Sequence, residues 1–451
     1  MMRSTRSWIA GLVVGVGMTG VIAEAAEFHV YEGESIQVAI EQAVDGDVVI
    51  VHPGVYNEAI DFLGKGIALR SSQPSMPDLV ILDGTDLNNS VVTIRDVGMK
   101  AASVEGLTIR RGVGTPAPNG TKGGAIYISN SGPHILDCVI EENEVSGVGG
   151  GIAVQSGWPI VERTVFRNNT ADFGGGGFRS SSSTSLFISC DFEENRAASG
   201  SWGGGLHALN GSVGLINTRF SWNYGSYGGG LASVGARVTA VNCNFVSNSV
   251  SSAGGAVLIT ESITSPPSFA NCVFWANEAG NGPKSLFVLN NPETVVEFSA
   301  LDDIWAGDGS ATNMLIEYDP GFVDPFNGDF SLRSDSVLRD AGENDAFPPS
   351  IETDALGNER IVYERIDIGA VEYQDDPQED PDPDTAPKPD FNDDGWVDHS
   401  DLFPLLAAWG EFRSAEDEQY DLNEDGWVDA GDLAILLGAW GPVSGQDQME
   451  W

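Results

Sequence analysis

The chain has 451 residues, enough for one large domain with small appendages, and its 66 acidic and 22 basic residues give a formal net charge of −44. This charge argues against binding to nucleic acid or to an anionic membrane surface, because both require cations that displace counterions. It suits a calcium-rich exterior, and it also keeps an extracellular protein in solution.

The first 26 residues are typical of an export signal. Arg3 and Arg6 precede an apolar run at residues 8–21, and Ala23-Glu24-Ala25 offers a small-x-small cleavage site. The run is too short and too rich in glycine for a good membrane span, and no later segment is apolar for long enough. We therefore expect a secreted or cell-surface protein without a transmembrane span, mature from about Ala26.

Residues 35–51 predict a short amphipathic helix followed by a strand. Ile36, Ala39, Ile40 and Ala43 recur at helical spacing, and the apolar run VVIV follows at residues 48–51. A helix of this kind is the natural cover for the exposed end of a repeat array. Irregular coils are expected next, at VILDG (80–84) and VEGLTIRRG (104–112).

From residue 123 the chain repeats a glycine cluster, an apolar strand, a polar turn and a second strand that ends in an asparagine. The asparagines lie 26, 26, 28, 25 and 29 residues apart, at Asn143, Asn169, Asn195, Asn223, Asn248 and Asn277. Short strands at a period near 26, with no helical spacing between them, predict one coil of a parallel β-helix per repeat. We therefore predict an all-β parallel β-helix solenoid over residues 27–373.

Coils of a β-helix stack at about 4.8 Å, so equivalent positions form ladders. An apolar ladder is expected inside, at Ile140, Phe166, Phe192, Phe220, Phe245 and Phe274. The asparagines should form an amide ladder at a turn, each bonding its neighbours above and below. The glycines should mark a bend where φ is positive or where backbones approach closely.

The four cysteines share one phase of the repeat. Cys138, Cys190, Cys243 and Cys272 should therefore face inward as buried thiols. Only Cys243 and Cys272 would lie on adjacent coils, close enough to bond, and the sequence leaves their pairing open.

After the repeats, residues 286–373 lose the glycine clusters but keep strand-like runs, and they close with DIGAVEY at 367–373. The next stretch, residues 374–389, alternates proline with like charge, so it cannot build a core and should be an extended, stiff linker.

These stretches carry a family resemblance. The start of the chain resembles the secreted right-handed parallel β-helix proteins of the pectate-lyase-like superfamily. The glycine clusters with their aromatic-x-x-Asn partners are similar to the repeats of polymorphic outer-membrane, adhesin-type proteins. Residues 319–342 and 354–373 resemble the closing module of surface β-helix proteins that carry varied C-terminal anchors. The resemblances span residues 27–373 and imply a fold rather than an activity.

Two near-copies of one acidic stretch, DFNDDGWVD (390–398) and DLNEDGWVD (421–429), stand near the C-terminus. A calcium loop needs oxygen ligands at positions 1, 3, 5, 7, 9 and 12, with glycine at position 6. The first copy offers Asp390, Asn392, Asp394, the carbonyl of Trp396, Asp398 and Asp401. The second offers Asp421, Asn423, Asp425, the carbonyl of Trp427, Asp429 and Asp432. We predict two calcium ions, one in each EF-hand-like loop.

Each loop runs into an apolar segment that predicts a helix, at residues 402–410 and 433–441. Neither helix can bury its face alone, so the two should pack antiparallel about a pseudo-twofold axis, with Trp409 and Trp440 in a small shared core. Pro404 is expected in the first helical turn, where its missing N–H does little harm. Metal binding should supply most of the folding free energy of this small module.

The duplicated loop and helix resembles a type I dockerin over residues 390–441, followed by a tail at 442–451. This resemblance implies docking onto a cohesin-like scaffold protein. The family's partner-contacting positions, the tenth and eleventh of each loop, are often Ser-Thr. Here they are His399-Ser400 and Ala430-Gly431, which departs from that pattern.

Three functions remain open for the β-helix. The favoured one is a non-catalytic protein that binds extracellular polysaccharide or partner proteins, with Trp202, Trp222 and Trp275 able either to stack on sugar rings or to serve ordinary packing. The second is a polysaccharide lyase or glycoside hydrolase for an acidic, pectin-like or alginate-like polymer. The third is a structural spacer that carries the tail outward.

The residues that could serve catalysis form no clear constellation in the sequence. These residues are Arg110-Arg111, Glu141-Glu142, Glu193-Glu194, Asp302-Asp303, His52, His134 and His207. Surface charge and acidic solvated turns explain them as well as catalysis does, so the sequence assigns no catalytic residue.

Overall fold

The structure is a computed structural model. It describes residues 25–118, 120–261, 266–290, 293–302, 306–316, 318–374, 389–392, 396–397, 399–411, 418–420, 422, 427–428, 433, 435–436 and 441–442. The export signal expected at residues 1–26 therefore lies almost wholly outside the described residues. The chain divides into two compact units, residues 1–373 and 374–451.

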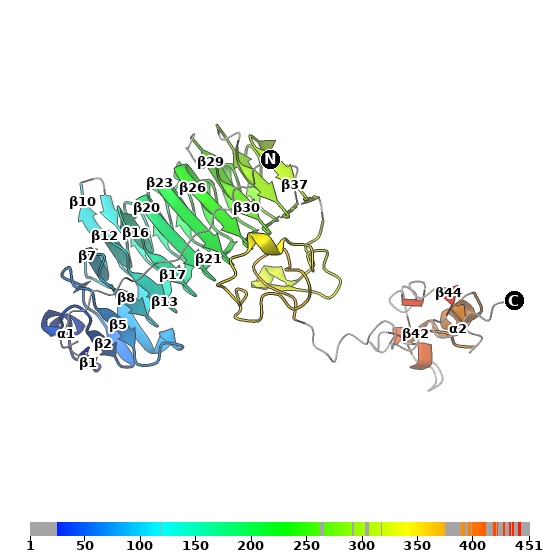
Figure 1. Ribbon diagram of the computed structural model, residues 1–451, viewed down its shortest axis with the longest axis horizontal. Coiled ribbons are helices and arrows are strands. Elements are labelled where there is room, and N and C mark those ends of the chain that lie inside the picture. The colour runs from blue at the N-terminus through cyan, green and yellow to red at the C-terminus, as the bar shows by residue number, and fades with distance from the viewer. Residues whose placement is uncertain are drawn as a thin grey trace, which may run out of the picture. The chain divides into compact units, whose positions relative to one another are not determined.

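The first unit is built from coils of parallel strands that follow one another along the chain, from the blue to the green part of Figure 1. Its largest sheet has nineteen strands: β1 (Glu27–Val30), β2 (Val48–Val51), β4 (Ile60–Asp61), β5 (Ala68–Ser71), β7 (Val92–Gly98), β8 (Ser103–Glu105), β12 (Ile126–Ser131), β13 (His134–Leu136), β16 (Ile152–Gln155), β17 (Ile160–Glu162), β20 (Phe178–Ile188), β23 (Leu206–Ile216), β26 (Leu231–Val241), β29 (Val257–Thr260), β30 (Ser268–Ala270), β33 (Leu286–Val288), β34 (Val295–Glu297), β36 (Ala306–Gly307) and β37 (Ser310–Thr312).

Two further parallel sheets complete the coils. The second sheet has eleven strands: β3 (Gly54–Tyr56), β6 (Val80–Asp83), β9 (Thr108–Arg110), β14 (Val139–Glu141), β18 (Val165–Arg167), β21 (Asp191–Glu193), β24 (Arg219–Ser221), β27 (Asn244–Val246), β31 (Val273–Trp275), β35 (Ala300–Leu301) and β38 (Leu315–Ile316). The third has six: β15 (Glu144–Val145), β19 (Thr170–Ala171), β22 (Arg196–Ala197), β25 (Tyr224–Tyr227), β28 (Ser249–Ala253) and β32 (Glu278–Ala279). The all-β parallel solenoid that the repeat predicts is confirmed.

The predicted ladders are present with the predicted members. Ile140 pairs with Phe166, and Phe166, Phe192, Phe220, Phe245 and Phe274 follow in register on successive coils. The phenylalanine rings stack with centroids 4.5–5.1 Å apart and nearly parallel planes. Aromatic burial therefore runs as one continuous column through the core.

The asparagine ladder is equally regular. Each Nδ2 donates to the Oδ1 of the next asparagine at 2.9–3.1 Å, from Asn143 through Asn277. The same Oδ1 also accepts the backbone N–H of the preceding asparagine, as between Asn169 and Asn195 at 3.2 Å. All six side chains are buried, so these bonds satisfy amides that would otherwise be costly to remove from water.

The glycine clusters serve both expected purposes. Gly203 has φ +65°, a conformation that other residues rarely adopt. Gly204 follows, and a Cβ there would lie 2.4 Å from the carbonyl oxygen of Tyr224 on the next coil. The clusters thus let coils approach where a side chain would separate them.

A helix covers the first coil, as the sequence predicts. Helix α1 (Ile36–Gln42) buries Ile36, Ala39 and Ile40, and Ser35 caps its start by accepting the N–H of Val38. The four cysteines are buried free thiols, Cys243 and Cys272 included. The structure also contains a hairpin that was not predicted from the sequence. It consists of β10 (Thr115–Ala117) and β11 (Gly120–Lys122) and projects beside β12.

Residues 319–373, here called the closing module, fold back onto the outside of the coils (yellow in Figure 1). They contain one antiparallel pair, β39 (Phe322–Asp324) with β40 (Asp329–Leu332), and short 3-10 turns at Pro325–Asn327 and Asn344–Ala346. A further 3-10 turn, Pro77–Leu79, precedes β6. The strand-like run at 367–373 forms no strand, so that expectation is wrong: side chains and loop carbonyls bond its backbone instead.

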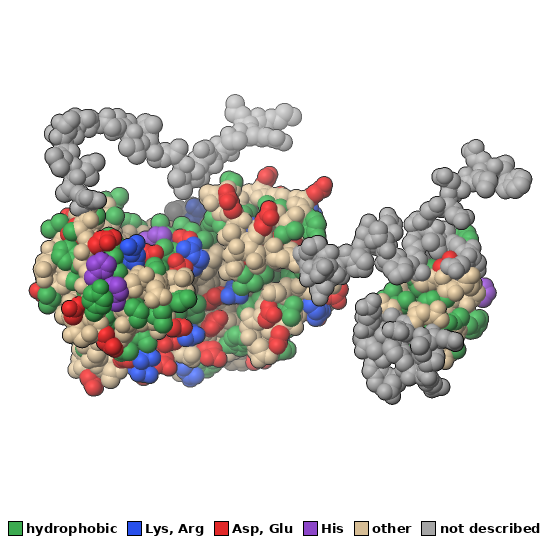
Figure 2. All heavy atoms as spheres, turned by 90° about the horizontal axis from the view of Figure 1, so that it is seen from below, with side chains coloured by type: hydrophobic (Ala, Val, Ile, Leu, Met, Phe, Trp, Pro, Cys, Tyr) green, Lys and Arg blue, Asp and Glu red, His purple; other side chains and the backbone are tan. Residues whose placement is uncertain are grey.

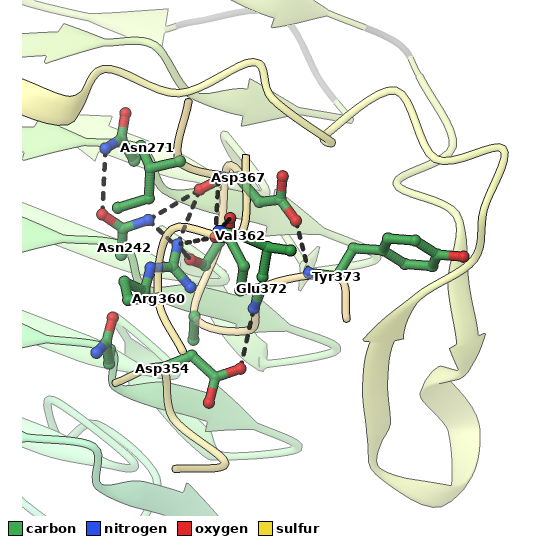
Figure 3. A network of polar contacts seen from close by, with 12 residues as sticks. Asn242, Asn271, Asp354, Arg360, Val362, Asp367, Glu372 and Tyr373 are labelled. Atoms are coloured by element: carbon green, nitrogen blue, oxygen red, sulfur yellow. Dashed lines mark hydrogen bonds and ion pairs between the residues drawn. The ribbon is translucent and has the colours of Figure 1, made fainter. Parts of the chain in front are cut away.

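A buried polar network holds the closing module to the coils (Figure 3). Asn242 donates through Nδ2 to the carbonyls of Asp367 and Gly369, at 2.9 and 3.0 Å. Arg360 is completely buried and donates through Nη2 to the same two carbonyls. Glu372 lies 3.7 Å from Arg360 and accepts the N–H of Asp367 at 3.0 Å. Apolar contacts with Trp222 and Trp275 complete the junction.

In the second unit, helix α2 (His399–Ala407) is described together with four short strands and a 3-10 turn at Glu418–Tyr420. Strand β41 (Trp396–Val397) pairs with β44 (Gly441–Pro442), and β42 (Gly410–Glu411) pairs with β43 (Trp427–Val428). A shift of 31 residues converts the first pairing into the second. The two strand pairings are thus related by the duplication in the sequence, whereas most of the second expected helix, residues 433–441, lies outside the described residues, so its antiparallel packing stays a prediction.

Two details of the second unit differ from expectation. Helix α2 begins at His399, so Pro404 lies in its second turn rather than its first. Trp409 is 40% exposed and does not belong to the buried core, which consists of Val397, Leu405, Val428 and Leu436. Trp440 lies outside the described residues. Among the residues that the structure describes, no helix is long and apolar enough to cross a membrane.

Candidate functional site

Outward-facing positions also stack into ladders, and one ladder of the largest sheet changes abruptly in side-chain size. Tyr127 on β12, Ala153 on β16, Arg179 on β20 and His207 on β23 follow one another in register. Because coils are about 4.8 Å apart, the small Ala153 leaves a notch between a tyrosine and an arginine.

The notch is a pocket of about 220 Å³, here called the Arg179 pocket. Its lining comprises Thr121, Lys122, Tyr127, Val148, Ala153, Val154, Gln155, Arg179 and Ser181. Lys122, at the end of the β10–β11 hairpin, donates through Nζ to Oε1 of Gln155 at 2.7 Å. The same Nζ lies 5.8 Å from the centroid of the Tyr127 ring, so the hairpin brings a cation to the rim.

Arg179 is only 9% exposed. Its Nη1 contacts both ring nitrogens of His207, at 3.2 Å from Nε2 and closer to Nδ1. Burial lowers the pKa of Arg179 to about 10, which still leaves the guanidinium protonated at neutral pH. Burial, reinforced by that guanidinium, holds the pKa of His207 well below its ordinary value, so His207 is neutral and accepts the hydrogen bond.

The positive charge of Arg179 has no opposite charge beside it among the described residues. Its contacts there are to His207, its pKa shift has burial as its cause, and its Nε has no hydrogen-bond partner. A buried charge is costly unless an opposite charge or a full set of hydrogen bonds compensates it. The arrangement can therefore accept an anionic group at the guanidinium.

Aromatic rings continue the face beyond His207. Trp202 stacks on Tyr227 with centroids 4.9 Å apart, and lies 6.2 Å from the His207 ring at an interplanar angle of 18°. Of the three tryptophans considered for sugar stacking, Trp202 is thus the one beside this pocket. Trp222 and Trp275 pack against the closing module, so for those two the packing alternative holds.

Four of the charged residues singled out from the sequence, Arg110, Arg111, Glu141 and Glu142, form ion pairs along the eleven-stranded sheet. Arg110 donates to Asp83 at 2.8 Å, and Arg167 lies 2.7 Å from Glu141. Arg111 contacts Asp83 at 3.3 Å and Glu142 at 3.2 Å. These pairs alternate in sign from coil to coil and stabilise the stack, which is the structural explanation that the sequence left open.

The remaining candidates are dispersed. His52 lies beside His29 near the N-terminal cap, His134 lies 3.2 Å from Glu162, and His207 contacts Arg179 without lining its pocket. Asp302 accepts the N–H of Ala276 and the hydroxyl of Ser285, whereas Asp303 lies outside the described residues.

A second, larger hollow of about 750 Å³ separates the coils from residues 348–357 of the closing module. Asp191 lines it and accepts from Nη2 of Arg219 at 2.7 Å. Glu193, two residues along the same strand, has a pKa raised by burial and by the charge of Asp191, against the opposing effects of Arg219 and Arg167. Two carboxyl groups in unlike environments are a possible acid and base pair.

Part of the segment predicted to be the first calcium loop is described. Asp401, the position-12 residue, is completely buried, and its Oδ1 accepts the backbone N–H of Phe391 at 2.7 Å. The Nδ2 of Asn392 donates to the hydroxyl of Ser400 at 2.8 Å. The end of this segment therefore returns to its start, and a fully buried carboxylate there is compatible with the predicted calcium ion.

The other predicted ligands add little to this test. Trp396 and Trp427 occupy equivalent positions in β41 and β43. Asp390 is described at the start of the first loop. Asp394, Asp398, Asp421, Asn423, Asp425, Asp429 and Asp432 lie outside the described residues.

Sequence reasoning missed Arg179 and Lys122. Arg179 is a single departure from the repeat, in the serine-rich strand FRSSSSTSLFI, so the period of the sequence does not indicate it. Aligning the repeats on their glycine clusters would have placed Tyr127, Ala153, Arg179 and His207 at one outward position. The contribution of Lys122 depends on a hairpin that interrupts the repeat.

Comparison with a known family agrees with the architecture. A family described as "right handed beta helix region" matches residues 90–282. The crystal structure of pectate lyase Pel9A is similar, with a TM-score of 0.44 and 12% sequence identity over 78% of this chain and 97% of that one. No curated protein matches.

Proposed function

We propose that this protein is a secreted or cell-surface solenoid that binds extracellular polysaccharide through the Arg179 pocket. A sugar ring offers an apolar face for Tyr127 or Trp202, and an acidic sugar offers a carboxylate or sulfate for Arg179. Lys122 at the rim supplies a second cation for the same group.

One observation carries this proposal: Arg179 is a buried cation whose compensating anion is absent among the described residues. The rest of the protein is strongly acidic, with a net charge of −44, so general electrostatics repel an acidic polymer. Binding therefore requires a local cationic site of this kind. Partner proteins with exposed carboxylates are the competing ligands of the same chemistry.

The second part of the proposal concerns the tail. Residues 390–441 hold two calcium ions and dock the protein onto a cohesin-like or other surface scaffold. The buried carboxylate of Asp401 and the reciprocal strand pairing, which matches the duplicated sequence, support this reading. The ions would neutralise carboxylates that otherwise repel one another.

The binding proposal is tested by calorimetry of the full chain with polygalacturonate and with neutral xylan. Arg179→Met should weaken binding to the acidic polymer about 10- to 100-fold, the loss expected for charge-assisted hydrogen bonds worth roughly 1.5–3 kcal/mol. Arg237→Met, which removes an exposed arginine from strand β26 of the same sheet, is the matched control.

Stability separates a binding role from a structural one. Removing a buried charge that lacks a counterion should leave the unfolding temperature of Arg179→Met unchanged or higher. Unaltered polygalacturonate binding in this variant, or equal binding of both polymers by the wild type, would overturn the proposal.

An alternative function is a polysaccharide lyase or glycoside hydrolase, favoured specifically by Asp191, which lines the larger hollow, with Glu193 two residues along the same strand. Incubation with pectin, alginate and xylan, with calcium and with chelator, tests it. New reducing ends or unsaturated products that disappear in Glu193→Gln would establish catalysis there. Binding without products would leave the non-catalytic proposal standing.

A further inference from the structure

Two histidines meet on the first coils, away from the Arg179 pocket. His29 lies on β1 and His52 directly follows β2, and the Nδ1 of His29 is 3.0 Å from the Nε2 of His52. Figure 2 shows histidine side chains (purple) exposed at the N-terminal end of the solenoid, with both acidic (red) and basic (blue) side chains around them. From this geometry we propose that His29 and His52 chelate a divalent transition-metal ion.

The separation of the two nitrogens suits a shared ion. Imidazole nitrogens bind zinc at about 2.0–2.1 Å, so two nitrogens on one ion lie roughly 2.9–3.3 Å apart for bond angles between 90° and 109°. The observed 3.0 Å falls inside this range. A small rotation of either ring turns both lone pairs toward one point, and the ion then replaces the proton shared by the rings.

The backbone under both histidines is fixed before any metal arrives. The N–H of His52 donates to the carbonyl of Val30 at 2.9 Å, in the parallel pairing of the first two coils. The hydroxyl of Tyr56 donates to the carbonyls of His52 and Val30, at 2.8 and 3.3 Å. Tyr31 covers the His52 ring face to face at 4.2 Å. Little ordering entropy is therefore lost on binding.

A carboxylate stands behind the first ligand. Oε2 of Glu27 is 3.8 Å from the Nε2 of His29, on the far side of the ring from the proposed ion. Metal-binding histidines commonly direct their second nitrogen to a carboxylate, which orients the ring and raises its basicity. Arg70 lies 3.9 Å from the other oxygen of Glu27 and leaves Oε2 facing His29.

The surroundings favour a cation. Glu32, Glu34 and Glu58 lie around the cap and raise the pKa of Tyr56 to about 12, together with the larger effect of its burial. Nitrogen ligands select zinc, copper or nickel over calcium, which prefers oxygen. The site is therefore chemically distinct from the loops of the tail.

Titration of the full, calcium-saturated chain with Cu²⁺ and Zn²⁺ tests the site. Electron paramagnetic resonance of the first Cu²⁺ equivalent should show coupling to two imidazole nitrogens, and calorimetry should show one Zn²⁺ site. His29→Ala and His52→Ala should each weaken this site at least tenfold, while Glu27→Gln weakens it less. His134→Ala, which removes an exposed histidine beside Glu162, should change nothing.

The variants also exclude simpler explanations. His52→Ala distinguishes the site from chelation by His29 with the amine at the start of the mature chain, which does not need His52. Both histidines lie at the surface, so the metal-free variants should unfold within a few degrees of the wild type, and His52→Gln serves if His52→Ala does not fold. A copper spectrum with one nitrogen, or zinc affinity equal in wild type and His52→Ala, would overturn the proposal.

Discussion

Two buried arginines of the solenoid differ in what surrounds their charge. Arg360 donates to two backbone carbonyls and lies among Asp354, Asp367 and Glu372, whose charges raise its pKa against the larger lowering effect of burial. The pKa of Arg179 is lowered by burial, and no neighbouring charge contributes to this shift. The charge of the first arginine thus has acidic neighbours, although its Nε and Nη1 lack hydrogen-bond partners, whereas the charge of the second has no acidic neighbour among the described residues.

The acidic partners of Arg360 make the closing module sensitive to pH. Burial raises the pKa of Glu372 to about 8, with a further contribution from Asp367, against the lowering effect of Arg360. Burial also raises the pKa of Asp367. A carboxyl group with a higher pKa in the folded state stabilises the fold below its unfolded pKa, and this stabilisation is lost as the pH rises toward 8.

We therefore expect the unfolding temperature of the first unit to fall between pH 5 and pH 8.5, and the Glu372→Gln variant to show a flatter profile. Differential scanning calorimetry at several pH values measures both curves. Glu278→Gln, a change at an exposed glutamate of β32, is the control and should keep the wild-type slope. Parallel curves for wild type and Glu372→Gln would mean that another group titrates.

Among the elements of the solenoid, the turn that carries the asparagine ladder joins each coil to the next by hydrogen bonds. Asn195 donates to Oδ1 of Asn223 at 3.0 Å and to the carbonyl of Phe166 at 2.8 Å. Its Oδ1 accepts both the N–H and the Nδ2 of Asn169. Asn195→Ala removes all four bonds from a buried site and should destabilise the first unit by about 3 kcal/mol, measured as a lower guanidinium midpoint.

Asn281→Ala is the control for that experiment, because Asn281 lies in an exposed turn and should change stability by less than about 0.5 kcal/mol. Equal midpoints for the two variants would show that the ladder contributes little. Reduced cooperativity in Asn195→Ala, rather than a lower midpoint, would show that it uncouples neighbouring coils.

Repetition determines which parts of the fold and of the candidate site could be predicted from the sequence. The phenylalanine and asparagine ladders recur through successive repeats between residues 140 and 277, so their members follow from the period alone. Arg179 and the β10–β11 hairpin occur once, and a single departure from a repeat carries no periodic signal. The closing module covers Trp222 and Trp275. It is held in place by contacts such as the hydrogen bond between Asn242 and Asp367, which are 125 residues apart, and no local sequence pattern predicts such a contact.

At the scale of the whole molecule, the two units differ in what stabilises them. The solenoid has a continuous core that runs from the cap helix to the last coils. The second unit is small, and its described core consists of Val397, Leu405, Val428 and Leu436 with partly buried apolar residues packed against them. Calcium binding is the expected additional source of folding free energy there.

Chelation should therefore unfold the second unit and leave the first intact. In hydrogen exchange of the full chain with a calcium chelator, peptides covering β41–β44 should lose protection while β20 and β23 keep theirs. Asp401→Ala should reproduce this loss in the presence of calcium, because it removes the buried carboxylate that closes the first loop. Asp376→Asn, which removes one negative charge from the linker, should not. If the peptides around β41–β44 stay protected in chelator, packing alone holds the second unit together and calcium is not needed for its fold.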